Sequence, residues 1–308
     1  MKLLETGIRL SLPYNHDPGY PEWLDGHVAG VAEVYFPLHW SVSLSARTWA
    51  GPADPAGYEA QLGELAAVLN RAGLTGNVTL NLMVFERQYL EIERTLGRLA
   101  ERFDHLAVTL ADFAFARRLH RDLPALTLGV STMAQVDSTE RARCWRDDAG
   151  VSAVVLARHI NKRLDHIRSI RALGLRIKMV LDDLCLPDCP AFMWHVGWLM
   201  DVKDRRVTSH PCPMQAARTH EAWKIAQKDV VPAILPRYDG LVDIGKLEGR
   251  EAELEAIDRR RRLYLEAESW DHPNHAYREP PEAFDRICAC DRECLPCGWC
   301  PAHFQPVP

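Results

Sequence analysis

The chain has 308 residues, of which 47% are hydrophobic and 26% are charged, a balance typical of proteins that bury a sizeable core. Its length is usual for one α/β barrel, which needs about 250 residues, followed by an extension. The formal net charge of -5 gives no basic footprint for general nucleic-acid binding, so a small molecule or a peptide is the expected substrate.

The sequence indicates neither export nor a membrane span. The first residues lack the apolar run of a secretion signal, and no stretch approaches the roughly 20 apolar residues that a membrane helix requires. We therefore expect a cytoplasmic protein that is not bound to a membrane.

Short runs rich in β-branched residues alternate with segments of helical periodicity. Segments 58–72 and 89–103 carry apolar residues three and four apart, as amphipathic helices do. Parallel strands need such crossover helices, so the order predicts a TIM-like (β/α)8 barrel. The eight predicted strands are 7–12, 31–36, 77–83, 105–110, 126–131, 153–157, 176–181 and 230–235.

Polar residues follow several of these strands. In α/β barrels the reactive side chains lie at the carboxyl ends of strands. We therefore expect polar residues from separate strands to meet on one rim, with Arg158 as a catalytic candidate. The other polar residues that we expect on this rim are Tyr14, Asn15, His16, Asn81, Ser131, Thr132, His159 and Asn161.

Helical periodicity ends near residue 268, and the Pro280-Pro281 pair follows it. We predict a barrel over residues 1–267 and a cysteine-rich, metal-binding tail over 268–308. Five of the nine cysteines lie in the tail, within thirteen positions, and such close spacing directs several thiolates to one centre. These are Cys288, Cys290, Cys294, Cys297 and Cys300.

A second cysteine group follows the seventh predicted strand and comprises Cys185, Cys189 and Cys212. If one tail cysteine completes this site, four remain, so the count permits one or two 4Fe-4S clusters, with Cys144 as the spare thiol. A compact run that ends in Cys-Pro favours iron-sulfur ligation, and zinc is the alternative metal. Cys185 and Cys189 could also be buried small hydrophobes.

Charged residues supply further candidates. Lys246, Glu248 and Arg250 alternate along the chain, so an extended segment would place all three on one side, where they could hold an anionic group or form a surface ion-pair strand. His195 lies between two tryptophans and is either a ligand or proton-transfer residue, or a packed helix residue. The segment Asp258-Arg259-Arg260-Arg261-Arg262 predicts a solvated helix face, and the alternative is a local basic patch that binds nucleic acid.

The segment Lys246-Leu-Glu-Gly-Arg250 and the stretch from Asn161 through Cys185-Leu-Pro-Asp-Cys189-Pro resemble the collagenase-like peptidase family, type U-32. The resemblance covers about residues 153–267. Several of that family's barrel-only members are similar to oxygen-independent hydroxylases that use a cysteine-bound 4Fe-4S cluster and act on RNA bases or a quinone precursor, with prephenate as the implied oxygen donor. The resemblance implies ligation by Cys185, Cys189 and Cys212, and a structural or substrate-binding role for Glu248 and Arg250.

Three functional hypotheses follow. The first is an iron-sulfur oxidoreductase that performs oxygen-independent hydroxylation or another redox step, with Arg158, His195, Glu248 and Arg250 as catalytic candidates. The second is a non-catalytic electron-transfer module or partner subunit, which would pair with an electron donor or a second subunit. The third takes the peptidase name literally.

Overall fold

The computed structural model describes residues 6–43, 51–182, 189–192, 194–195, 230, 232–250, 252–266, 277–278, 286, 288–290 and 305–306. Its centre is a closed barrel of parallel strands in chain order, in which β8 pairs with β1. The strands are β1 (Arg9–Pro13), β2 (Val31–Pro37), β3 (Thr75–Leu80), β4 (Leu106–Leu110), β5 (Thr127–Val130), β6 (Ala153–Val155), β7 (Arg176–Val180) and β8 (Ile244–Lys246).

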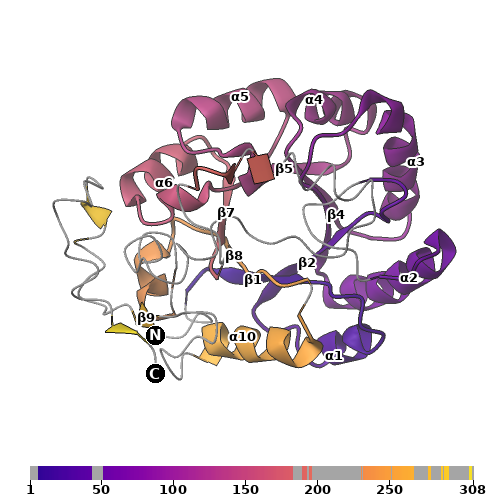
Figure 1. Ribbon diagram of the computed structural model, residues 1–308, viewed down its shortest axis with the longest axis horizontal. Coiled ribbons are helices and arrows are strands. Elements are labelled where there is room, and N and C mark those ends of the chain that lie inside the picture. Colours follow the sequence, from indigo (N-terminus) through magenta and orange to yellow (C-terminus); the bar gives the residue numbers. More distant parts are fainter. Residues whose placement is uncertain are drawn as a thin grey trace.

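Helices surround the barrel in the order of the chain, and α10 lies beside α1 (Figure 1). The predicted TIM-like (β/α)8 fold is confirmed. The helices are α1 (Tyr20–Asp25), α2 (Pro55–Ala72), α3 (Tyr89–Ala100), α4 (Phe113–Asp122), α5 (Thr139–Ala149), α6 (Leu164–Arg171) and α10 (Leu254–Glu266). Short 3-10 turns are η2 (Glu86–Gln88), η3 (Thr132–Ala134), η4 (Arg158–Ile160) and η5 (Pro232–Tyr238), and β9 (Tyr277–Arg278) pairs with β10 (Gln305–Pro306).

Local sequence signals explain where α2 begins and ends. The Asp54 carboxylate accepts a hydrogen bond of 2.7 Å from the Gly57 N–H, and Pro55 occupies the first turn, where no amide hydrogen is needed. The helix ends at Gly73, which adopts a φ of 63° that side chains with a Cβ disfavour. Residues within one turn of each end therefore determine where α2 begins and where it ends.

The eighth predicted strand was wrong. Residues 232–238 form η5, and β8 lies further along the chain, at Ile244–Lys246. Pro232 and Pro236 lack the amide hydrogen that a central strand must donate. Val230, Ile234 and Leu235 of this apolar run are buried. They pack in the hydrophobic core without forming a strand of the sheet.

Strand alternation divides apolar from polar side chains. The core lies between the strands and the helices, where Leu10, Val34 and Val78 are no more than 1% exposed. The alternate positions, such as Glu33 and Asn77, are also buried but polar, and they face into the barrel. The barrel interior is therefore more polar than the layers of branched aliphatic residues usual in this fold.

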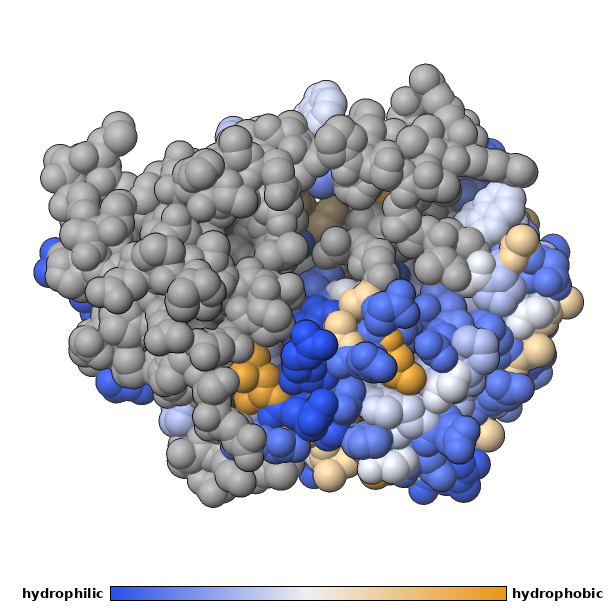
Figure 2. All heavy atoms as spheres, turned by 60° about the horizontal axis from the view of Figure 1, so that its bottom comes forward, coloured by the Kyte–Doolittle hydropathy of each residue, from blue (hydrophilic) through white to orange (hydrophobic). Residues whose placement is uncertain are grey.

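The outer surface that α1, α2 and α10 present is mostly hydrophilic (Figure 2). Arg259 and Arg262 are exposed there, whereas Arg260 and Arg261 are 6% and 7% exposed. The prediction of a solvated arginine face was therefore wrong for two of the four residues, because a run of four spans the whole circumference of a helix.

Among the described helices, none combines the length and apolar character needed to cross a membrane. The predicted boundary at residues 267 and 268 falls outside the described residues.

Candidate functional site

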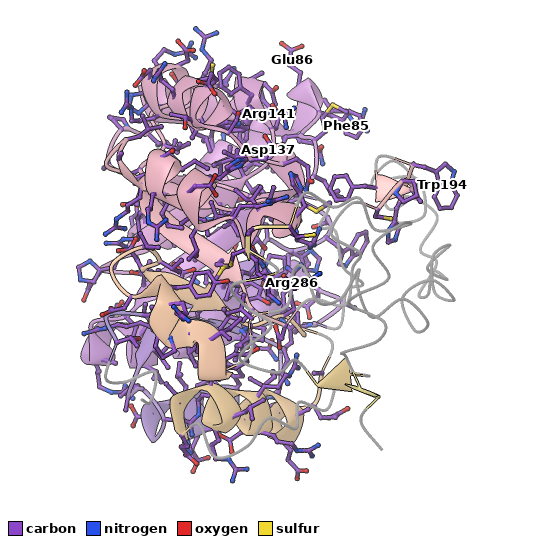
Figure 3. The ribbon with its side chains drawn as sticks, turned by 90° about the vertical axis from the view of Figure 1, so that its left-hand side faces the viewer. Phe85, Glu86, Asp137, Arg141, Trp194 and Arg286 are labelled. Carbon is purple, nitrogen blue, oxygen red and sulfur yellow. The ribbon has the colours of Figure 1, made fainter. Side chains whose placement is uncertain are left out.

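The candidate site lies at the carboxyl ends of the strands. Figure 3 shows Phe85 and Glu86, which follow β3, Asp137, which follows β5, and Trp194, which follows β7, on one side of the barrel. The side chain of Trp194 is 57% exposed and projects farthest from it. This is the rim at which the sequence predicted a site.

The three charged residues at and after β8 converge on this rim. The Lys246 ammonium lies 4.1 Å from the centroid of the Tyr35 ring and 3.6 Å from the Glu248 carboxylate. The Arg250 guanidinium lies 5.8 Å from the same ring and donates a hydrogen bond of 3.1 Å to the Thr79 hydroxyl. Arg250 is only 6% exposed, so the segment turns inward and is not a surface ion-pair strand.

A buried carboxylate supports this segment. Asp182, just after β7, accepts a hydrogen bond of 2.8 Å from the Glu248 N–H and contacts the Arg260 guanidinium at 3.3 Å. Burial raises the pKa of Asp182 to about 6, and Arg260 opposes this rise. Asp182 thus holds the backbone of the segment whose side chains face the rim.

His16 occupies the loop after β1 with a positive φ of 66°, a conformation that costs a non-glycine residue energy. Its ring is 8% exposed and lies 5.0 Å from the ring of Tyr14 and 5.4 Å from that of Tyr58. Burial, assisted by the charge of Arg250, lowers the pKa of His16 to about 4. His16 therefore stands as a neutral imidazole beside a cation.

Below the rim, a polar network crosses the barrel. Glu33 accepts hydrogen bonds of 2.8 Å from the Ser11 hydroxyl and from the Asn77 amide, which in turn accepts from Thr109 at 2.9 Å. Lys178, on β7, donates to the other oxygen of Glu33. Although burial alone would raise the pKa of Glu33, the ion pair with Lys178 and these hydrogen bonds hold it below its usual value.

A cavity of about 610 Å³ opens at the opposite, amino-terminal end of the barrel. Small residues such as Ala107, Gly129 and Ala153 line it, and the Glu33–Lys178 pair contributes to its wall. It is separate from the rim that carries the predicted site.

Arg158 and His195, the other two catalytic candidates, both follow strands. Arg158 lies in η4, after β6, and is 7% exposed. His195 is half-buried in a helical turn in which its N–H donates to the Ala191 carbonyl at 2.8 Å. Both lie beyond the carboxyl ends of their strands, as predicted, and their catalytic role stays a prediction.

Four of the nine cysteines are described. Cys189 is a half-buried free thiol in the segment that follows β7, Cys144 is an exposed free thiol on α5, and Cys290 is half-buried in the tail. The role of Cys144 as the spare cysteine stays a prediction. Cys288 packs against the core, and its carbonyl accepts from Arg163, the residue before α6, at 3.5 Å. Cys185, Cys212, Cys294, Cys297 and Cys300 lie outside the described residues.

Within the described part of the chain, no group of three or more His, Cys, Asp or Glu side chains is arranged to hold a metal ion. Reduced thiol donors are nevertheless suited to an iron-sulfur cluster. Arg163 follows β6 and donates to the Cys288 carbonyl, and Cys189 follows β7, the strand that pairs with β6. The described cysteines thus include thiols of the chemistry that a cysteine-bound group requires.

The sequence analysis did not identify Arg260, Lys178 and Glu33 as members of buried ion pairs. Arg260 carried no signal within its run of arginines. A charged residue inside an apolar strand, as in Val-Ala-Glu33-Val-Tyr and Arg-Ile-Lys178-Met-Val, was a usable signal, because such a charge must find a partner when buried.

Comparisons with known proteins bear on the family and the fold of the chain. A family model described as Peptidase family U32 matches residues 29–186. A protein of Methanocaldococcus jannaschii named "Uncharacterized protease MJ1657" is 27% identical over 197 residues, which cover 57% of this chain and 58% of that protein. The chain thus aligns with less than two thirds of that relative.

The solved structure of the U32 peptidase Mk0906 superposes with a TM-score of 0.60 and 15% identity, covering 80% of this chain and 95% of that one. At this identity the likeness concerns the fold alone. Since the family model covers half of the sequence, from just before β2 to the loop after β7, the chain belongs to peptidase family U32.

Proposed function

We propose that this U32 protein is an iron-sulfur enzyme, whose 4Fe-4S cluster at the carboxyl rim supports oxygen-independent hydroxylation or another redox step on a small molecule or peptide. The ligands would be Cys185, Cys189, Cys212 and one tail cysteine. The remaining tail cysteines would hold a second cluster. When bound, such a cluster supplies electron transfer or an open iron site.

The observation that carries the proposal is the position of Cys288. Its carbonyl accepts a hydrogen bond from Arg163, which follows β6, and Cys189 lies in the segment that follows the neighbouring strand, β7. A tail placed there can contribute a thiolate to the group of cysteines after β7. Cys288 and Cys189 are 99 positions apart in the sequence, so no local spacing relates them.

The chain's own residues define what substrate the rim would accept. Lys246 and Arg250 place two cations beside the Tyr35 ring, an arrangement suited to an anionic group attached to an apolar body. Glu248 neutralises Lys246 in part, and the neutral His16 near Arg250 can accept or donate one proton.

Anaerobic purification tests the proposal, with iron, zinc and acid-labile sulfide quantified per chain and EPR spectra recorded before and after dithionite reduction. We expect about four or eight irons with matching sulfide. Cys189→Ser should lose about four irons, whereas Cys144→Ser, which alters the exposed thiol on α5, should lose none. Zinc without sulfide, or unchanged iron in Cys189→Ser, would overturn the proposal.

Peptidase activity is a second candidate, favoured by the names of two similar proteins. Hydrolysis of a casein substrate, unaffected by chelators and by Cys189→Ser, would support it over the redox enzyme. Iron-sulfur clusters without turnover of any substrate would instead favour an electron-transfer or partner subunit.

A further inference from the structure

The ends of β7 and β8 are joined by the hydrogen bonds of the sheet and, beyond them, by charged side chains. The two strands pair in parallel, with Val180 opposite Lys246, and the Leu181 N–H donates to the Lys246 carbonyl at 3.0 Å. Beyond this point the chain leads from β7 to Asp182 and from β8 to Glu248. The position of Glu248 relative to the end of β7 therefore depends on what holds these two chain ends together. We call the segment after β7 that carries Cys189 the cysteine loop.

Two charged side chains hold the Glu248 backbone from both sides. Asp182 accepts from its N–H at 2.8 Å, and Arg260, on α10, donates to its carbonyl at 2.6 Å. Arg260 also contacts the Asp182 carboxylate at 3.3 Å, which closes a ring of three interactions. The Asp182 side chain is fully buried and that of Arg260 is 7% exposed.

The next residue, Gly249, has a backbone conformation that leaves room for the Arg260 guanidinium. Gly249 has a φ of 111°, outside the region that residues with a Cβ normally adopt. A Cβ on Gly249 would lie 2.3 Å from a terminal nitrogen of Arg260. This turn separates the direction of the Glu248 side chain, which faces Lys246, from that of Arg250, which enters the barrel.

A contribution to folding stability does not by itself explain why Asp182 and Arg260 form a buried ion pair. Removing two charges from water costs free energy that their attraction does not reliably recover, and apolar residues of similar volume often serve better. Asp182 and Arg260 instead hold the two successive peptide groups on either side of the Glu248 Cα, which gives the backbone of Glu248 a single position.

We propose that Asp182 and Arg260 are positioning residues, which fix the backbone of Glu248 against the end of β7 and thereby set where Glu248 and Arg250 stand relative to the segment that carries Cys189. The link to the cysteine loop rests on the proposed function. The positioning of the Glu248 backbone is independent of that proposal.

The chain offers a matched control at the other end of the same strands. Asp243 accepts a hydrogen bond of 2.7 Å from the Ile177 N–H of β7 and pairs with Arg171 on α6. This is the same chemistry, a carboxylate that joins a backbone amide to an arginine, although Asp243 is more exposed, at 30%. Asp243→Asn therefore controls for the loss of an Asp–Arg pair as such.

Hydrogen–deuterium exchange on the whole protein tests the positioning. Asp182→Asn should accelerate exchange at the Glu248 amide by about tenfold or more, without acceleration at Ile177. The reason is that the neutral Asn oxygen is a weaker acceptor than the carboxylate and the ion pair with Arg260 is lost. Asp243→Asn should do the reverse. If Asp182→Asn folds and the Glu248 amide exchanges at the wild-type rate, the inference is wrong. Should Asp182→Asn not fold, Arg260→Lys, which keeps the charge but lacks the planar fork, answers the same question.

The coupling to the cysteine loop has a separate readout. In cluster-loaded protein, Asp182→Asn should keep wild-type iron and sulfide but change the EPR line shape and the reduction midpoint, and Asp243→Asn should change neither. Superimposable spectra and midpoints would overturn the coupling. Absence of iron and sulfide in the wild type would overturn the proposed function and this coupling, and the exchange result would still decide the positioning.

Discussion

The ammonium of Lys178 lies 2.5 Å from the Glu33 carboxylate inside the barrel, and the two side chains are 4% and 3% exposed. They come from β7 and β2, strands on different sides of the closed sheet. The pair, with the hydrogen bonds of Ser11 and Asn77 to Glu33, links strands across the barrel axis.

Removing one partner of this pair should strongly destabilise the fold. Lys178→Met leaves an uncompensated buried carboxylate, so we expect a loss of about 3–5 kcal/mol in the free energy of unfolding, measured by urea denaturation. Glu33→Gln combined with Lys178→Met should recover part of it. The control is the exposed Arg71–Asp25 pair, where Arg71→Met should cost less than about 1 kcal/mol. A Lys178→Met loss no larger than the control's would contradict the prediction.

The raised pKa of Asp182 should produce a pH dependence of stability. Because the pKa of Asp182 is about 6 in the folded protein and 3.8 is ordinary for an exposed Asp, the folded state binds more protons between these pH values. Ionisation of Asp182 therefore lowers stability as the pH rises from about 4 to about 6. Urea midpoints at several pH values should show that Asp182→Asn lacks this contribution. Identical pH profiles for the two proteins would contradict it.

His16 should remain neutral across the physiological range. Its pKa of about 4 predicts that its ring protons do not titrate in NMR spectra between pH 5.5 and 8, and His16→Asn, which tolerates a positive φ, identifies the signal. Arg250→Met should raise the pKa of His16 because a nearby cation is removed. Arg87→Met, which alters an arginine stacked on Phe85, should not. A wild-type midpoint near 6.5 would show that the ring is solvated.

Gly249→Ala should disrupt the segment after β8. Besides the cost of its φ, a methyl group there would collide with the Arg260 guanidinium. Gly73 provides the control, since it also has a positive φ, of 63°, but has open space around it. We expect Gly73→Ala to cost about 1 kcal/mol in urea unfolding and Gly249→Ala at least twice as much. Equal losses would show that the Arg260 contact is unimportant.

The fold was largely readable from sequence because its signals are local. The first seven predicted strands overlap β1 to β7, since alternation and flanking turn residues mark each one. The eighth failed because an apolar run is consistent with any buried segment, and only the prolines argued against a strand. Glu248 and Arg250 were singled out by their alternation and by their motif, whereas their place on the rim emerged only from the structure, because β8 lies at Ile244–Lys246.

The sequence by itself determined the alternating elements, the cap residues of α2 and the density of cysteines, because each depends on neighbours within a few positions. Only the tertiary structure decided that Asp182 meets Arg260, that Lys178 meets Glu33 and that Arg250 reaches Thr79. These pairs are separated by 78, 145 and 171 positions. Closing the barrel brings them together, and once water is excluded, each buried charge must be matched by whatever group the packing places beside it.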